Sequence, residues 1–150
     1  MSRLAAPLLL AAEEGGRIDN LILQPAVHRT SGVIVLVAMV AASAYLAKLA
    51  FAGKRMDRNG RILLAVAQVM LMVQALLGIK LLDQGMGANQ LYIHYVGGLM
   101  PLGFFLAAGW FGRSDSATRT RVLAALTVVG MLSAGMAFFI GQAYVNRGVA

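Results

Sequence analysis

Four long apolar runs dominate this chain and leave few folds open to it. They span positions 32–52, 62–82, 91–112 and 122–145. A helix needs roughly 20 apolar residues to cross about 30 Å of hydrocarbon, so each run fits one membrane crossing and none is long enough for two. Helices are expected because lipid cannot bond exposed backbone groups and the runs lack the alternation of a β-barrel.

The composition excludes several classes of protein. Charged residues make up 13% of the 150 residues and hydrophobic residues 59%, whereas a soluble domain carries about 25% charged residues. With no cysteine in the chain, structural disulfides, thiolate metal sites and cysteine nucleophiles are excluded. The net charge of +7 falls at the ends of the apolar runs, so we interpret it as a topology signal and predict no nucleic-acid partner.

Basic residues concentrate in two of the three expected loops. The middle loop, residues 83–90, has no Lys or Arg. By the positive-inside rule the two basic loops are cytoplasmic, which puts both termini on the outer, periplasmic side. We therefore predict an all-α, four-transmembrane-helix up-down bundle in the cell inner (cytoplasmic) membrane. The basic residues are Lys54, Arg55, Arg58 and Arg61 in the first loop, and Arg113, Arg119 and Arg121 in the third.

The chain divides into a tail and one domain. Residues 1–24 are predicted to form an extramembrane N-terminal tail, because the short apolar stretch after Arg3 lacks a signal-type ending. Residues 25–146 are predicted to form the transmembrane domain, and Pro25 suits the first turn of its first helix. The helices are expected at about 25–52, 62–82, 90–112 and 120–146.

The first and third helices open with a similar pattern around the two histidines of the chain. Val27-His28 is followed by Gly32, and Ile93-His94 is followed by Gly98, so that each glycine lies four positions after its histidine. This short repeat indicates two parallel helical hairpins related by an axis along the membrane normal. His28 and His94 are then expected at similar depth near the outer surface, on helices that face each other across the bundle.

Two imidazoles at matched depth predict a cofactor site. An ionisable residue inside a membrane helix indicates function, and haem iron accepts two axial imidazoles. Gly32 and Gly98 lie one turn from the histidines and leave room for a flat macrocycle, while Arg29, or less favourably Lys80, can pair with its propionates. A bare metal ion fits less well, since no carboxylate or thiolate is near.

The alternative to a cofactor site is purely structural. Each histidine then bonds a neighbouring helix, the glycines permit close packing, and Arg29 anchors the helix at the interface. Three glutamines are interpreted as interhelical hydrogen-bonding residues: Gln68 and Gln74 in the second helix and Gln142 in the fourth. The fourth helix also carries a stripe of small residues that predicts close packing: Gly130, Ala134, Ala137 and Gly141. No catalytic residue is predicted, because the helix interiors contain no carboxylate and no catalytic motif is present.

The residues from Asn20 to Gly32, with Gln24, Pro25 and Val27-His28-Arg29, together with the run from Gln74 to Ile79 and the later His94, resemble the haem A synthase family. That family is typically built from two four-helix halves, each with a histidine on its first and third helices, and this chain resembles one half. The resemblance implies that His28 and His94 ligate a haem b near the outer face, beside Arg29.

Two departures from the family pattern concern its oxidising activity. In the catalytic half a Glu stands three positions before the first histidine, where this chain has Pro25, and a cysteine pair often lies in an external loop. The resemblance is therefore closer to the half that binds haem b without oxidising it. We predict a haem b-binding membrane protein for electron transfer or haem handling, surrounded by lipid and acting as a homodimer or beside a larger energy-transducing complex. The alternatives are a structural subunit of a respiratory or photosynthetic complex and, third, an oxidising enzyme of haem maturation.

Overall fold

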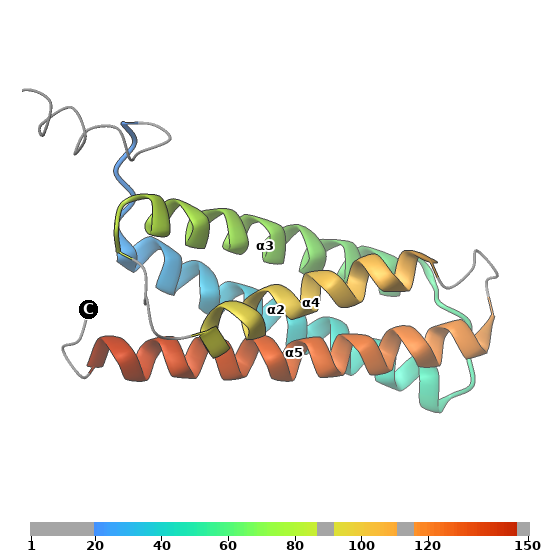
Figure 1. Ribbon diagram of the computed structural model, residues 1–150. Coiled ribbons are helices and arrows are strands. Elements are labelled where there is room, and N and C mark those ends of the chain that lie inside the picture. The colour runs from blue at the N-terminus through green and yellow to red at the C-terminus, as the bar shows by residue number, and fades with distance from the viewer. Residues whose placement is uncertain (1–19, 87–91, 111–115, 147–150) are drawn as a thin grey trace, which may run out of the picture.

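The described part of the chain consists of α-helices joined by short connections. A computed structural model describes residues 20–86, 92–110 and 116–146, where the helices are α2 (Pro25–Phe51), α3 (Arg58–Asp83), α4 (Tyr92–Trp110) and α5 (Ala117–Asn146). Successive helices run in opposite directions, so α2 begins at the same end of the molecule at which α5 ends (Figure 1). The predicted all-α, four-helix up-down bundle is confirmed for these residues.

Three of the helices are long and apolar enough to cross a membrane. These are α2, α3 and α5, with 27, 26 and 30 residues, and α4 adds a shorter apolar segment, Tyr92–Ala108. The outward faces are apolar as well: Leu76 is 64% exposed and Leu132 is 62% exposed. Apolar side chains on the outside suit a surface that contacts lipid. The helices therefore indicate a multi-pass membrane protein.

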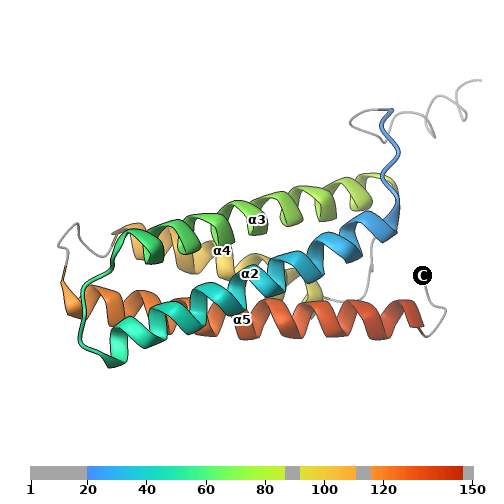
Figure 2. The same cartoon turned by 180° about the vertical axis from the view of Figure 1, so that it is seen from behind.

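The helices make a ring with one loosely closed side. α2 packs against α3 and α5, and α5 also packs against α4, whereas α3 and α4 make few contacts. Figure 2 shows the same bundle from behind, with α2 and α4 crossing its middle between α3 and α5. Within the described residues α2 and α4 are not neighbours, which places the two histidine-bearing helices diagonally across the bundle, as the repeat predicts.

Two helices begin earlier than the apolar runs predict, because polar side chains cap them. Asp57 accepts a hydrogen bond from the amide of Gly60 at 2.8 Å, so α3 begins at Arg58 and not near residue 62. The hydroxyl of Ser116 accepts from the amide of Arg119 at 3.1 Å, so α5 begins at Ala117 and not near residue 120. Such side-chain acceptors satisfy amides that have no partner inside the helix.

At the end of the bundle that carries the histidines, one glutamine links the segment before α2 to the end of α3. Pro25 begins α2, as predicted. The side-chain amide of Gln84, just after α3, donates to the main-chain oxygen of Leu23 at 2.9 Å and accepts from the amide of Leu23. This pair of bonds ties the segment before α2 to the end of α3. Of the predicted tail, residues 1–19 lie outside the described residues, as do the loop residues 87–91 and 111–115, with Arg113.

The pattern of buried positions in the first helical hairpin recurs in the second, which extends the repeat seen around the histidines. Each hairpin consists of two helices: α2 with α3, and α4 with α5. Buried positions of α2 recur in α4 at the same sequence separation that relates His28 to His94. Buried positions of α3 recur in α5 at a constant but slightly shorter separation. The pairs are Val35 with Pro101, Met39 with Phe105, Ala42 with Ala108, Leu64 with Thr127, Ala67 with Gly130 and Leu71 with Ala134.

Candidate functional site

His28 and His94 meet inside the bundle near one end. Their ring centroids lie 6.4 Å apart, with the ring planes at 69° to each other. Both side chains are partly buried. They come from α2 and α4, whose backbones are not neighbours, so the contact depends on the length of the imidazole side chain. The structure thus brings together the two residues that the sequence analysis singles out.

The His28 ring is held by a residue of α3. The side-chain amide nitrogen of Gln74 lies 3.1 Å from Nδ1 of His28 and 3.0 Å from the main-chain oxygen of the same residue. The hydroxyl of Ser31 donates in turn to Oε1 of Gln74. The expected interhelical role of Gln74 is therefore confirmed, and its partner is one of the two histidines.

His94 is held by the backbone of α5. Its Nδ1 lies 2.8 Å from the main-chain oxygen of Ala137. A carbonyl oxygen can only accept, so Nδ1 carries the proton and donates. A ring that donates from one nitrogen keeps the lone pair of the other nitrogen, which is the arrangement of metal-binding histidines.

Each imidazole also lies against a glycine of the second helix in its own hairpin. A Cβ atom added to Gly78 of α3 would lie 3.3 Å from Cε1 of His28, and one added to Gly141 of α5 would lie 2.9 Å from Cε1 of His94. The two glycines have the same separation along the chain as the paired buried positions of α3 and α5, so they occupy equivalent places in the repeat. Neither place admits a side chain while the ring keeps its position.

The two glycines predicted to line a cofactor differ in their surroundings. A Cβ on Gly32 would lie 3.1 Å from the Phe138 ring and 3.3 Å from the side-chain amide nitrogen of Gln74, whereas a Cβ on Gly98 would meet nothing within 4 Å. The position of α3 that is equivalent to Phe138 is Ala75. The Phe138 ring therefore occupies the space against Gly32, whereas the space beside Gly98 is open.

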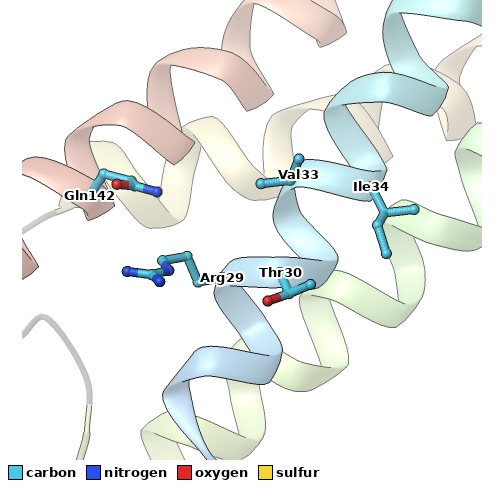
Figure 3. A pocket seen from close by; sticks show the side chains of 5 residues that line it. All are labelled: Arg29, Thr30, Val33, Ile34 and Gln142. Atoms are coloured by element: carbon cyan, nitrogen blue, oxygen red, sulfur yellow. The ribbon is translucent and has the colours of Figure 1, made fainter.

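Arg29 lies in a depression on the α2–α5 side of the bundle. The depression measures about 480 Å³ and is lined by Arg29, Thr30, Val33 and Ile34 of α2 and by Gln142 of α5. Arg29 and Gln142 extend into the space between the two helices from opposite sides (Figure 3). Lys80, the other cation considered for propionates, is bonded to Asp83 at 2.6 Å. Arg29 is thus the better placed of the two for an anionic group.

The donor set suits a metal that already carries other ligands. Two imidazoles that bind one metal through bonds of about 2.0 Å have ring centres about 6 Å apart, which is close to the separation of His28 and His94. Among the described residues no group of three or more His, Cys, Asp or Glu side chains could hold a metal ion. Because two imidazoles alone leave a bare ion incompletely coordinated, the pair fits a metal held in a macrocycle better.

Comparison with known proteins finds no match among protein-family models, curated sequences or solved structures.

The contacts of Gln74, Gly78 and Ala137 with the histidines were not predicted from the sequence. The sequence nevertheless contains a relevant pattern. Gly78 lies one helical turn after Gln74, and Gly141 lies one helical turn after Ala137. The first pair is separated from the second by the same number of residues as the paired buried positions of α3 and α5. The short repeat around the histidines has a longer separation along the chain. The two separations differ because equivalent positions lie closer together along the chain in the second hairpin (Pro101 to Thr127) than in the first (Val35 to Leu64), which hides the second repeat from a search at one period.

Proposed function

We propose that the protein binds a haem b within the membrane, with His28 and His94 as its axial ligands. The observation that carries this proposal is the approach of the two imidazoles from diagonal helices to a centroid separation of 6.4 Å. When bound, haem supplies one-electron redox chemistry. The chain's own residues hold the ligands in place, through Gln74 for His28 and the Ala137 carbonyl for His94.

Two glycines let the proposed ligands lie close to the neighbouring helices. Gly78 of α3 lies against the His28 ring and Gly141 of α5 lies against the His94 ring, so each imidazole rests on helix backbone with no side chain between them. Arg29, with Gln142 beside it, would bind the propionates through charge-assisted hydrogen bonds.

The resemblance to the haem A synthase family supports the same interpretation, with the chain as one four-helix half. Pro25 at the position of the family's Glu, together with the absence of cysteine, favours the haem-binding role over oxidation of haem. The proposed setting is the inner membrane with both termini outside. In that orientation the starts of α3 and α5, with Arg58, Arg61, Arg119 and Arg121, share the cytoplasmic end of the bundle.

A reduced-minus-oxidised visible spectrum of the purified protein, as isolated and after addition of haem b, tests the proposal. The expected result is the sharp α-band of a bis-histidine haem, which is lost in both His28→Ala and His94→Ala. Gln68→Leu serves as the matched control, because it removes a polar side chain of α3 other than Gln74, and it should keep the band. A folded wild-type protein that stays colourless after addition of haem contradicts the proposal.

A second candidate function is that of a structural subunit in a larger membrane complex. The observation that favours it is the face of α3, whose most apolar stretch buries 11% of its residues, against 33% in α2 and 28% in α5. A partner helix could cover this face through close packing. Copurification with other subunits in fixed ratio, without a haem spectrum, would favour this function over the first.

A further inference from the structure

We infer that the side of the bundle between α3 and α4 is a lateral opening, through which an apolar molecule dissolved in the bilayer reaches the histidine pair. The opening itself is inferred from the packing of the haem-free protein. That the entering molecule is haem b rests on the proposed function. On that function, the cofactor enters the bundle from the lipid on one side only.

The repeat makes two of the helix–helix interfaces equivalent. Since α2 corresponds to α4 and α3 corresponds to α5, the interface of α2 with α5 has its counterpart in the interface of α4 with α3. The two interfaces are packed very differently, because α2 packs closely against α5, whereas α3 and α4 make few contacts. The bundle is therefore closed on one side and loosely closed on the equivalent side.

One pair of equivalent positions shows this difference in detail. A Cβ atom on Gly32 would lie 3.1 Å from the Phe138 ring, so this ring of α5 covers the backbone of α2. The counterparts are Gly98 in α4 and Ala75 in α3, where a methyl group stands in place of the phenyl ring. A Cβ atom on Gly98 would meet nothing within 4 Å. The alanine side chain is thus too short to cover α4 as the phenylalanine covers α2.

The open space lies at the level of the two histidines. Gly98 follows His94 by one helical turn, so the two residues share a face of α4. On α3, Ala75 follows Gln74, whose side-chain amide nitrogen lies 3.0 Å from the main-chain oxygen of His28. A molecule that passes between Gly98 and Ala75 therefore arrives beside both imidazoles.

The border of the opening is apolar. On α3, the exposed side chains of Met72 and Ile79 lie one turn before and one turn after Ala75. On α4, the exposed side chain of Leu99 lies beside Gly98. Because these border residues carry no charge, an apolar molecule can approach from the hydrocarbon of the bilayer without stripping water from a charged group.

The depression on the α2–α5 side is the less suitable entrance. Its lining includes the guanidinium of Arg29 and the side-chain amide of Gln142. Between the same two helices the Phe138 ring lies against Gly32. An apolar molecule that entered there would have to displace polar groups and a packed ring, whereas the α3–α4 side requires neither.

Spin labels in the haem-free, full-length protein test the opening. Because the chain has no cysteine, Gly98→Cys accepts a single nitroxide label, and Leu99→Cys places the label on an exposed position at nearly the same depth. In phosphatidylcholine vesicles, the collision rate of the Gly98 label with dissolved oxygen, an apolar probe, should approach that of the Leu99 label. Adding Ala75→Phe should lower the rate several-fold. Leu76→Phe, which adds a ring at an exposed position of α3, should leave it unchanged.

Two results overturn the opening: a Gly98 label that oxygen reaches far less often than the Leu99 label, or equal effects of Ala75→Phe and Leu76→Phe. The comparison of the two labels needs no bulky substitution, so it decides the matter even if Ala75→Phe prevents folding.

Uptake of haem b from the same vesicles tests the entry route. Ala75→Phe should slow uptake about tenfold, because the added ring has to be pushed aside, whereas Leu76→Phe should keep the wild-type rate. Equal rates in all three proteins overturn entry of haem on this side. If the oxygen results are as expected and the wild-type protein binds no haem, the proposed function fails while the opening stands. If haem binds and oxygen does not reach the Gly98 label, the reverse holds.

Discussion

The imidazole of His94 lies directly against the backbone of Gly141, where a Cβ atom would be 2.9 Å from Cε1 and 3.0 Å from Nδ1 of the ring. Real Cβ contacts essentially never come below 3.0 Å, so an alanine at residue 141 forces the ring or the helix to move. The bond from His94 to the Ala137 carbonyl, one turn earlier on α5, depends on the same close approach.

Gly141→Ala should therefore disturb the site, whereas Gly98→Ala should not disturb the haem-free protein. Each substitution gains up to about 1 kcal/mol of helix propensity, but overpacking at residue 141 costs about 1–3 kcal/mol. We expect a lower thermal unfolding temperature for Gly141→Ala and an unchanged or higher one for Gly98→Ala. Circular dichroism in detergent measures both, and equal stability of the two variants would show that His94 does not press on α5.

The open space beside Gly98 gives a second prediction, which rests on the proposed function. Gly98→Leu should leave the unfolding temperature of the haem-free protein nearly unchanged, because a Cβ there meets nothing within 4 Å. It should lower the amount of haem bound, since Gly98 lies one turn from His94 and its space is predicted to take the macrocycle. The measurement is the haem-to-protein ratio after addition of haem b. An unchanged ratio would remove Gly98 from the cofactor site.

A large side chain at Gly130, in the middle of the bundle, should destabilise the fold. A Cβ there would lie 3.3 Å from Cβ of Pro101 and 3.4 Å from the terminal methyl group of Met39. We expect Gly130→Leu to lower the unfolding free energy by about 1–3 kcal/mol through overpacking. Gly135→Leu on the same helix is the control, because its nearest neighbour is the Leu36 methyl group at 3.9 Å. Similar losses of unfolding free energy in both variants would show that crowding against Pro101 and Met39 does not cause the effect at Gly130.

The position of Arg29 predicts its effect on haem retention. Arg29→Gln should increase dissociation of haem during purification or dilution, because the charge-assisted bonds to the propionates are lost. Arg121→Gln removes the same charge at the opposite end of the bundle and should retain haem like the wild-type protein. The measurement is transfer of haem to an excess of a haem-scavenging protein. Equal rates for the two variants would make Arg29 an interfacial anchor only.

The cap of α3 predicts a pH dependence of stability. The hydrogen bond from the Tyr45 hydroxyl at 2.7 Å, followed by that from the Gly60 amide, lowers the pKa of Asp57 from its ordinary value of 3.8. A lowered folded-state pKa stabilises the fold above the unfolded-state value, and this contribution is lost as the pH falls through the folded-state value. The unfolding temperature should therefore fall as the pH is lowered from about 5 to below 3.8.

Asp57→Asn is the control for this loss, since asparagine can still cap the helix but does not titrate. Its unfolding temperature should change less than that of the wild-type protein over the same pH range. If the two proteins lose stability in parallel, acid acts through other carboxyl groups and the cap of α3 does not titrate as argued.

Much of the fold could be predicted from the sequence, because apolar length and charge act locally. The runs around residues 32–52, 62–82 and 122–145 correspond to α2, α3 and α5, and Pro25 marks the start of α2. The early starts of α3 and α5 could not be derived from hydropathy, since they depend on the capping oxygens of Asp57 and Ser116. The third run, at positions 91–112, corresponds to α4 at Tyr92–Trp110, and its positions 91, 111 and 112 lie outside the described residues.

By itself the sequence determined that this is a helical membrane protein and that His28 and His94 are its two candidate ligands, because helix period and hydropathy depend only on local residues. The tertiary structure decided how the histidines are held. Gln74, Ala137, Gly78 and Gly141 come within bonding or contact distance of the rings only once α3 and α5 pack beside α2 and α4. Side-chain partners across helices depend on rotation and depth, and no pattern along one helix specifies either.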